Sequence, residues 1–222
     1  MADRMEIIDE EIQEQVIDEL RWDPEVDPTD VGVEVDNGVV TLYGTVKSYP
    51  VKFASEKAAH RVRGVRAVAN EIRVQLPSDQ TRTDTDIATA AASALEWDTT
   101  VPHECIAVTV RDGWVTLEGD VDWGHQKEAA DKVVRNLTGI KGVTNVIAVM
   151  PRKVPPPVIR SRIEESLKRA KLGARPIHVE TTDGKVTLSG TVHSWAEREE
   201  AEKTAWAAEG VAAVENRITV AA

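Results

Sequence analysis

The chain has 222 residues, 41% hydrophobic and 29% charged, a globular composition that fits one large domain or several small ones. Its formal net charge of −11 opposes nonspecific binding to nucleic acid, because the summed field repels polyanions. A single cysteine, Cys105, excludes an intramolecular disulfide, a redox pair and a cysteine-rich zinc site.

The N-terminal residues are acidic and lead directly into an amphipathic pattern. Ile12, Val16 and Leu20 recur at a spacing of four, which marks one face of a helix. No basic start with an apolar run precedes them, so we expect no secretion signal and a cytoplasmic location. No stretch approaches eighteen consecutive apolar residues, so the sequence predicts no membrane-spanning helix.

Two strands are expected after this helix. Residues 31–35 alternate between apolar and other residues, which predicts a half-buried strand. Asn37-Gly38 then favours a type I′ hairpin, since both central residues of that turn have positive φ. The second strand follows the turn, with Val40 and Leu42 on one face.

A second helix and a last strand complete the unit. Small and apolar residues at helical spacing mark the helix, and Gly64 stands where such a helix ends. The helix positions are Ser55, Ala58, Ala59 and Val62, and the strand positions are Val68, Ile72 and Val74.

The whole unit occurs three times. An octet of pattern [DN]-G-x-V-T-L-x-G begins at Asn37, Asp112 and Asp183, and from the octet onward the copies stay in register without a gap. We interpret its glycines as turn residues, and an asparagine before each last strand as a partner of local backbone. These positions are Gly38, Gly44, Gly113, Gly119, Gly184, Gly190, Asn70, Asn145 and Asn216.

The repeat predicts an α+β chain of three tandem α-β-β-α-β modules at residues 5–77, 84–150 and 156–222. Each module is expected to form a three-stranded mixed sheet with both helices on one face. The hairpin is antiparallel, and the last strand returns parallel to the second through a right-handed crossover.

Charge is divided unevenly among the copies. Residues 1–77 hold 16 acids and 9 bases (net −7), residues 78–150 hold 12 and 6 (−6), and residues 151–222 hold 10 and 12 (+2). Cations lie opposite the apolar stripe of the third copy's first helix. We predict contact with an anionic phospholipid surface there, with a solvated helix face as the alternative. These cations are Arg160, Arg162, Lys168, Arg169 and Lys171.

Five of the six tryptophans divide into two groups. Trp22 and Trp97 occupy matching positions after the first helix, and we expect both to fill the same gap in the core. Trp114 lies on the sheet face away from the helices, Trp206 lies on a polar helix side, and Trp195 lies at a helix start. We predict these three as contact residues, with packing between repeats as the alternative.

No catalytic or metal-binding pattern is found. Four acids between residues 23 and 34 approach a calcium-loop spacing, but Pro28 occupies the position where that loop needs glycine. The histidines show no ligand spacing, and Ser189 lacks the Gly-x-Ser-x-Gly turn of a hydrolase. We therefore predict no enzyme activity, no cofactor and no metal.

The octet, the Gly-Val step at Gly64 and the asparagine entering the last strand together resemble the BON domain, named for bacterial OsmY and nodulation proteins. The resemblance implies a domain of osmotic-shock-inducible and transport-associated proteins, proposed to bind phospholipid, without catalytic residues and often exported. We expect a non-enzymatic, stress-related protein at a phospholipid or envelope surface. The alternative is a cytoplasmic scaffold that binds a protein partner, a copy of itself or a small ion.

Overall fold

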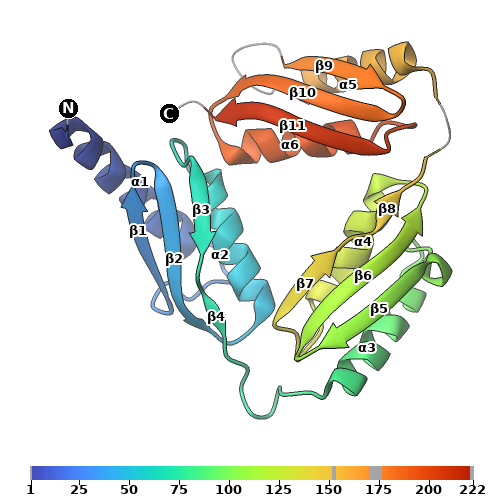
Figure 1. Cartoon of the computed structure of the whole chain (residues 1–222). Helices are drawn as coiled ribbons and strands as arrows, with labels where there is room; N and C mark the ends of the chain where they lie inside the picture. Colours follow the sequence, from blue (N-terminus) through green and yellow to red (C-terminus); the bar gives the residue numbers. More distant parts are fainter. Residues whose placement is uncertain (1, 152–153, 171–176, 221–222) are drawn as a thin grey trace.

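The polypeptide folds into three copies of one unit in tandem (Figure 1). This computed structural model describes residues 2–151, 154–170 and 177–220, with side chains from residue 8 onward.

The first module contains α1 (Ala2–Trp22), β1 (Val31–Asp36), β2 (Val39–Val46), α2 (Tyr49–Arg61), β3 (Ala67–Asn70) and β4 (Arg73–Val74). The second contains α3 (Asp84–Trp97), the 3-10 helix η1 (His103–Cys105), β5 (Ile106–Arg111), β6 (Trp114–Val121), α4 (Gly124–Arg135), β7 (Gly142–Asn145) and β8 (Ala148–Val149). The third contains α5 (Pro156–Ala170), β9 (His178–Thr182), β10 (Lys185–Val192), α6 (Trp195–Trp206) and β11 (Ala213–Val220). The predicted α+β architecture of three tandem modules is confirmed.

Each sheet starts with a tight hairpin. Asn37 and Gly38 have φ angles of 52° and 75°, the positive values that a type I′ turn requires. Val35 and Val40 then face each other in an antiparallel ladder. The Asp-Gly pairs of the other two modules also have positive φ at both residues.

The last strand is parallel to the second strand and completes the sheet on its other side. The sequence predicts one continuous strand here, and β11 is continuous, whereas modules 1 and 2 each divide it into two short strands. The register crosses this break unchanged: Leu42 pairs with Asn70 and Thr45 with Arg73, three residues further along both strands. The break is therefore a local interruption of the ladder and inserts no extra residue.

The last glycine of the octet lies against the loop that precedes the first strand. Gly44 has a φ angle of +134°, and a Cβ added there would collide with the carbonyl oxygen of Asp30. Gly119 stands in the same relation to the carbonyl oxygen of Cys105. The backbones approach so closely that only glycine fits.

An asparagine joins the second helix to the last strand. The Nδ2 of Asn70 donates to the carbonyl oxygen of Lys52 at 3.3 Å and to the Glu56 carboxylate at 2.9 Å. Its Oδ1 accepts the backbone N–H two residues further on, at 3.3 Å. The same two backbone bonds recur at Asn145 and Asn216.

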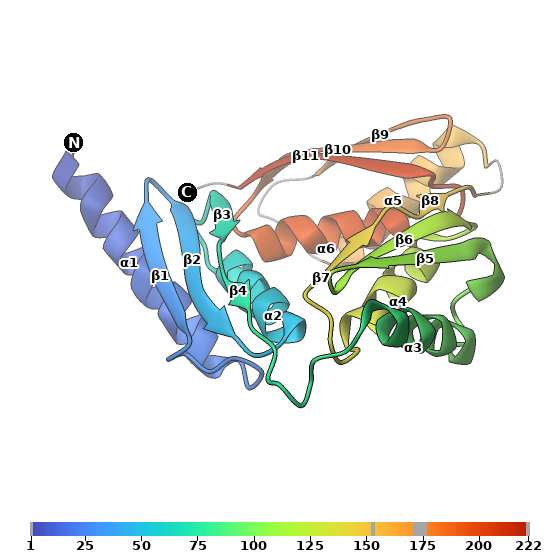
Figure 2. The ribbon, with the colours of Figure 1, turned by 60° about the horizontal axis from the view of Figure 1, so that its bottom comes forward.

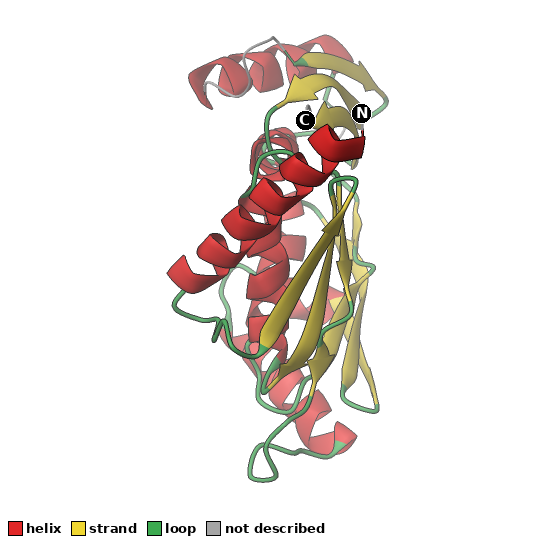
Figure 3. Cartoon of the chain, turned by 90° about the vertical axis from the view of Figure 1, so that its left-hand side faces the viewer, coloured by secondary structure: helices red, strands yellow, loops and turns green. Residues whose placement is uncertain are grey.

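Two helices cover one face of each sheet and enclose a separate core (Figure 3). In module 1 the stripe of Ile12, Val16 and Leu20 shares a buried cluster with Val40 and Leu42 of the central strand. The other modules repeat these positions with Ile, Ala, Val and Leu. Each module buries its own core, so contacts between modules add to the stability of units that already have a complete core.

The two tryptophans predicted to fill core gaps do not do so. The side chains of Trp22 and Trp97 are each 85% exposed. Each is the last residue of its helix, two residues after the buried Leu20 or Leu95, and this offset of about 200° turns it away from the sheet. The matching positions reflect the repeat and not a shared packing role.

Helix α6 extends from beside α2 toward the second module (Figure 2). At its N-terminal end Trp195 packs against the core of module 1. At its C-terminal end Trp206 packs against the cores of modules 2 and 3. One helix of module 3 thereby contacts both other modules.

Candidate functional site

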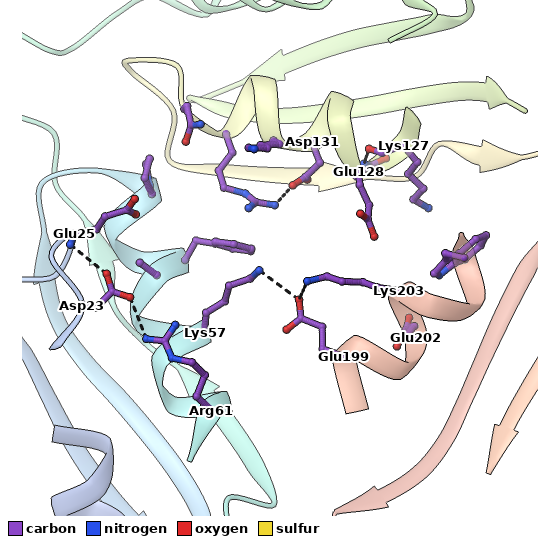
Figure 4. Close-up of a pocket in the computed structure, with 18 of the residues that line it drawn as sticks. Asp23, Glu25, Lys57, Arg61, Lys127, Glu128, Asp131, Glu199, Glu202 and Lys203 are labelled. Atoms are coloured by element: carbon purple, nitrogen blue, oxygen red, sulfur yellow. Dashed lines mark hydrogen bonds and ion pairs between the residues drawn. The ribbon is translucent and has the colours of Figure 1, made fainter. Parts of the chain in front are cut away.

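A cleft of about 900 Å³ lies where α2, α4 and α6 meet (Figure 4). Its volume suits a small ligand. Its lining is largely charged, however, whereas ligand pockets are lined mostly by apolar side chains. Acids and bases are equal in number, so the lining favours neither sign of ligand. They are Asp23, Glu25, Glu128, Asp131, Glu199 and Glu202 against Lys57, Arg61, Lys127, Lys132, Arg135 and Lys203.

Glu199 of α6 is held between two ammonium groups. Lys57 of module 1 lies 3.3 Å from its Oε1, and Lys203 of its own helix lies 3.2 Å from the same atom. Burial alone would raise the pKa of Glu199, but the two lysines outweigh it and leave that pKa below its usual value. The carboxylate therefore stays ionised and links modules 1 and 3.

Phe53 links modules 1 and 2. The guanidinium of Arg135, on α4, lies over its ring at 3.4 Å from the centroid, and Lys57 lies at 5.1 Å. Arg135 also pairs with Asp131 on its own helix, while its buried Nε has no hydrogen-bond partner among the described residues. A cation stacked on an aromatic face is stabilised by the ring quadrupole.

His60 and Trp195 form the second contact between modules 1 and 3. Their rings are stacked, with centroids 5.2 Å apart and planes 19° apart. Burial lowers the pKa of His60 below 6.5, although the carboxylates of Glu56 and Glu199 oppose this shift. The imidazole is therefore neutral at pH 7, the form that stacks at no desolvation cost.

The cations predicted to contact lipid lie on α5, and two of them are paired with acids. Arg160 lies 2.7 Å from Glu164, and Arg162 lies 3.0 Å from Glu209. Lys168 and Arg169 are exposed, and within residues 154–170 and the other described ranges neither forms an ion pair. Lys171 lies outside the described residues.

Of the three tryptophans predicted as contact residues, only Trp114 is exposed. Its side chain is 47% exposed on the outer sheet face of module 2, where Nε1 donates to the Thr144 hydroxyl at 2.8 Å. Trp195 and Trp206 are partly buried between modules. A Cβ on Gly124 would come within 2.9 Å of the Trp206 ring, so the polar side of α6 faces a neighbouring module instead of solvent.

The three tandem units decide the family. The BON domain family model matches residues 8–75, 83–151 and 157–222. The chain belongs to the BON domain family. No group of three or more His, Cys, Asp or Glu side chains in its described residues is placed to hold a metal ion. The helices within that part of this BON protein are also too short or too polar to cross a membrane.

Two curated proteins are similar to this BON chain. Osmotically-inducible protein Y of Escherichia coli (strain K12) is 31% identical over 121 residues, which cover 53% of this chain and 60% of the relative. A 21 kDa hemolysin of Actinobacillus pleuropneumoniae is 29% identical over 145 residues, 64% of this chain and 74% of the relative. The first alignment thus spans less than two thirds of the relative's length.

Solved structures of CdsD, a structural protein of the Type III secretion system of Chlamydia trachomatis, align with 95% of this BON chain at 14% identity. The alignment covers 92% of the CdsD chain and has a TM-score of 0.27.

The contacts between BON modules rest partly on residues that the sequence analysis does not single out. Phe53 and His60 lie on α2, apart from the small residues that mark its inner face. The available signal was a large aromatic ring on the polar side of a helix in a repeated unit. A ring at that position lies outside the core of its own module, which indicates packing against another module.

Proposed function

We propose that this BON protein is a non-enzymatic binding protein of the osmotic-stress response, and that α5 contacts anionic phospholipid. The stress assignment rests on similarity to an osmotically-inducible protein. The lipid assignment rests on one observation: Lys168 and Arg169 are exposed at the end of α5 and form no ion pair within the described residues. Exposed cations are attracted to the negative surface potential of anionic lipid.

The contact is peripheral. The apolar stripe of α5, Ile159, Ile163 and Leu167, is buried in the module core and is not free to enter the bilayer, although Val158 is 38% exposed. Attraction then depends on charge alone and decreases with salt, because ions screen exposed charges beyond about 10 Å at 0.1 M. The net charge of −11 opposes this attraction, and salt screens that repulsion as well.

Vesicle co-sedimentation tests the lipid assignment. Each cation near an anionic surface contributes about 1 kcal/mol, so we expect Lys168→Gln with Arg169→Gln to weaken binding by roughly 30-fold at low salt. The matched control neutralises two exposed cations of module 1, Lys47→Gln with Arg73→Gln, and should bind like the wild type. Equal binding by both variants, or equal binding to neutral vesicles, contradicts the proposal.

A hyperosmotic shift tests the stress assignment. We expect the abundance of the protein to rise in its host cells after the shift, as the name of the E. coli relative indicates for that protein. Abundance that does not change counts against a role in this response.

A protein-interaction scaffold is the second candidate, and Trp114 favours it. Its exposed ring lies in a hollow of about 390 Å³ on the outer sheet face, together with Thr109, Arg111 and Glu118. Exposed aromatic residues with polar neighbours are enriched at protein interfaces. A photo-crosslinker at Trp114 should then capture one defined protein that is absent when it is placed at Glu71; identical captures at both positions argue against this candidate.

A further inference from the structure

The ring of Trp97 is almost fully exposed to solvent. Its side chain is 85% accessible at the last position of α3, as is that of Trp22 at the last position of α1. One exposed ring is ordinary on a protein surface, so the charges around it decide whether it can bind another molecule. The surroundings of the two rings differ, and this difference distinguishes them.

The end of α3 carries uncompensated negative charge. Its last turn holds no basic residue, whereas the last turn of α1 holds Arg21. Glu96 is exposed beside Trp97, and within the described residues neither it nor Asp98 forms an ion pair. The C-terminal carbonyl groups of a helix add further negative potential. The Trp97 end therefore attracts cations.

The Trp22 end is largely neutralised by comparison. Asp23, which follows Trp22, pairs with Arg61 at 3.1 Å, and the same guanidinium lies 2.9 Å from Glu19. Arg21 pairs with Asp18. Asp18, Glu19 and Asp23 thus already have cationic partners inside the molecule.

The third module presents the complementary charge at the corresponding place. In the repeat register Trp97 corresponds to Arg169, and Lys168 and Arg169 are both exposed at the end of α5. Residues 78–150 carry a net charge of −6 and residues 151–222 a net charge of +2. We infer that the Trp97 end of α3 binds the Lys168 and Arg169 side chains of a second copy of this chain.

This contact joins two different surfaces. A guanidinium or ammonium group lies over the indole face while Glu96 and Asp98 neutralise its charge. Because each copy offers one end of each kind, the contact is head to tail and repeats from copy to copy. Association should therefore increase steadily with concentration and decrease with salt.

Sedimentation velocity of the full chain, without lipid, tests this contact. At low salt the wild type should sediment faster as its concentration rises, and Trp97→Ala should weaken the association by at least about fivefold. Trp22→Ala is the matched control, because it removes an equally exposed ring and should associate like the wild type. Glu96→Gln with Asp98→Asn removes the charges but keeps the ring, and should also weaken association.

Mixing two variants tests that the contact is head to tail. Lys168→Glu with Arg169→Glu should be monomeric alone, as should Trp97→Ala combined with Glu96→Gln and Asp98→Asn, which lacks both the ring and the charges. The mixture should form dimers, because one variant keeps the cationic end and the other keeps the Trp97 end. A mixture that stays monomeric, a wild type that is monomeric at every concentration, or equal effects of Trp22→Ala and Trp97→Ala would each overturn the inference.

Binding to vesicles is a separate outcome, although it uses the same two cations. If the wild type is monomeric and Trp97→Ala reduces its sedimentation with neutral phosphatidylcholine vesicles, the ring contacts lipid, and docking of a second copy is wrong. If the wild type self-associates but ignores anionic vesicles, the self-contact stands and the lipid assignment falls.

Discussion

Asn70 shows how one side chain secures a module. It completes two bonds to α2 and one to the backbone of the last strand, so its amide satisfies polar groups from both elements. The two backbone bonds recur at Asn145 and Asn216, and Asn216 also donates to the Glu202 carboxylate. The sequence predicts a local backbone bond, and the structure adds the bond to the helix, about eighteen residues away in the chain.

Asn70→Ala should lower the free energy of unfolding by about 1–3 kcal/mol, because it leaves a partly buried N–H and a carbonyl without their partner. Glu71→Ala, at the exposed neighbouring position, should change it by less than about 0.5 kcal/mol. Urea unfolding followed by circular dichroism measures both. Equal losses would mean that the amide bonds contribute nothing specific.

At the scale of an element, the ends of the helices decide what a tryptophan does. Trp22 and Trp97 end α1 and α3 and point into solvent, whereas Trp195 and Trp206 begin and end α6 and contact other modules. Sequence spacing places Trp206 on a polar helix side and Trp195 at a helix start, and it wrongly predicts that Trp22 and Trp97 fill the core. It does not identify which helix has a neighbour there.

Trp22→Ala should change the free energy of unfolding by less than about 0.5 kcal/mol, because its ring is almost fully solvated in the folded chain. Trp195→Ala should cost about 2 kcal/mol or more, since it removes a ring packed on the core of module 1. Chemical unfolding distinguishes them. A large loss from Trp22→Ala would restore the core role predicted from the sequence.

In the whole molecule, α6 and the cleft around it hold the three modules together. The contacts are of mixed kinds: a Phe-Arg stack, a His-Trp stack, an ion pair, and the rings of Tyr49 and Trp206 packed on the core of module 2. Charged contacts of this kind depend on pH and salt more than an apolar core does. The interfaces should therefore respond to solution conditions before the module cores do.

Acidification should weaken the contact between modules 1 and 3 through His60. Burial lowers the pKa of its imidazole below 6.5, so the unfolded chain binds the proton more readily. The stability from neutral His60 is thus present above about pH 6.5 and is lost as the pH falls toward the lower pKa of the folded state. The neighbouring charges are Glu56, Glu199, Arg198 and Lys57.

His60→Phe keeps a stacking ring and removes the titration, so its melting temperature should fall less than that of the wild type between pH 7 and pH 5. His193→Phe, at an exposed histidine, should follow the wild type. Thermal unfolding over this pH range measures the difference. Parallel curves for all three proteins would exclude His60 as the source.

Salt should weaken the ion pair between Lys57 and Glu199. Both side chains are about 40% exposed, so a double-mutant cycle of Lys57→Met and Glu199→Gln should give a coupling energy below about 1 kcal/mol. That coupling should fall toward zero in 0.5 M salt, roughly five times the ionic strength at which screening acts over about 10 Å. A coupling unchanged by salt would contradict an electrostatic origin.

The module could be predicted from the sequence: three repeats, the hairpin turn, and the stripes of core residues such as Ile12, Val16 and Leu20. These follow from local spacing and turn chemistry, which act within about 70 residues. The contact of Phe53 with Arg135, the burial of Trp206 and the exposure of Trp97 are seen in the three-dimensional structure alone. Those outcomes depend on surfaces brought together from distant parts of the chain, and periodicity within one helix carries no record of its neighbours.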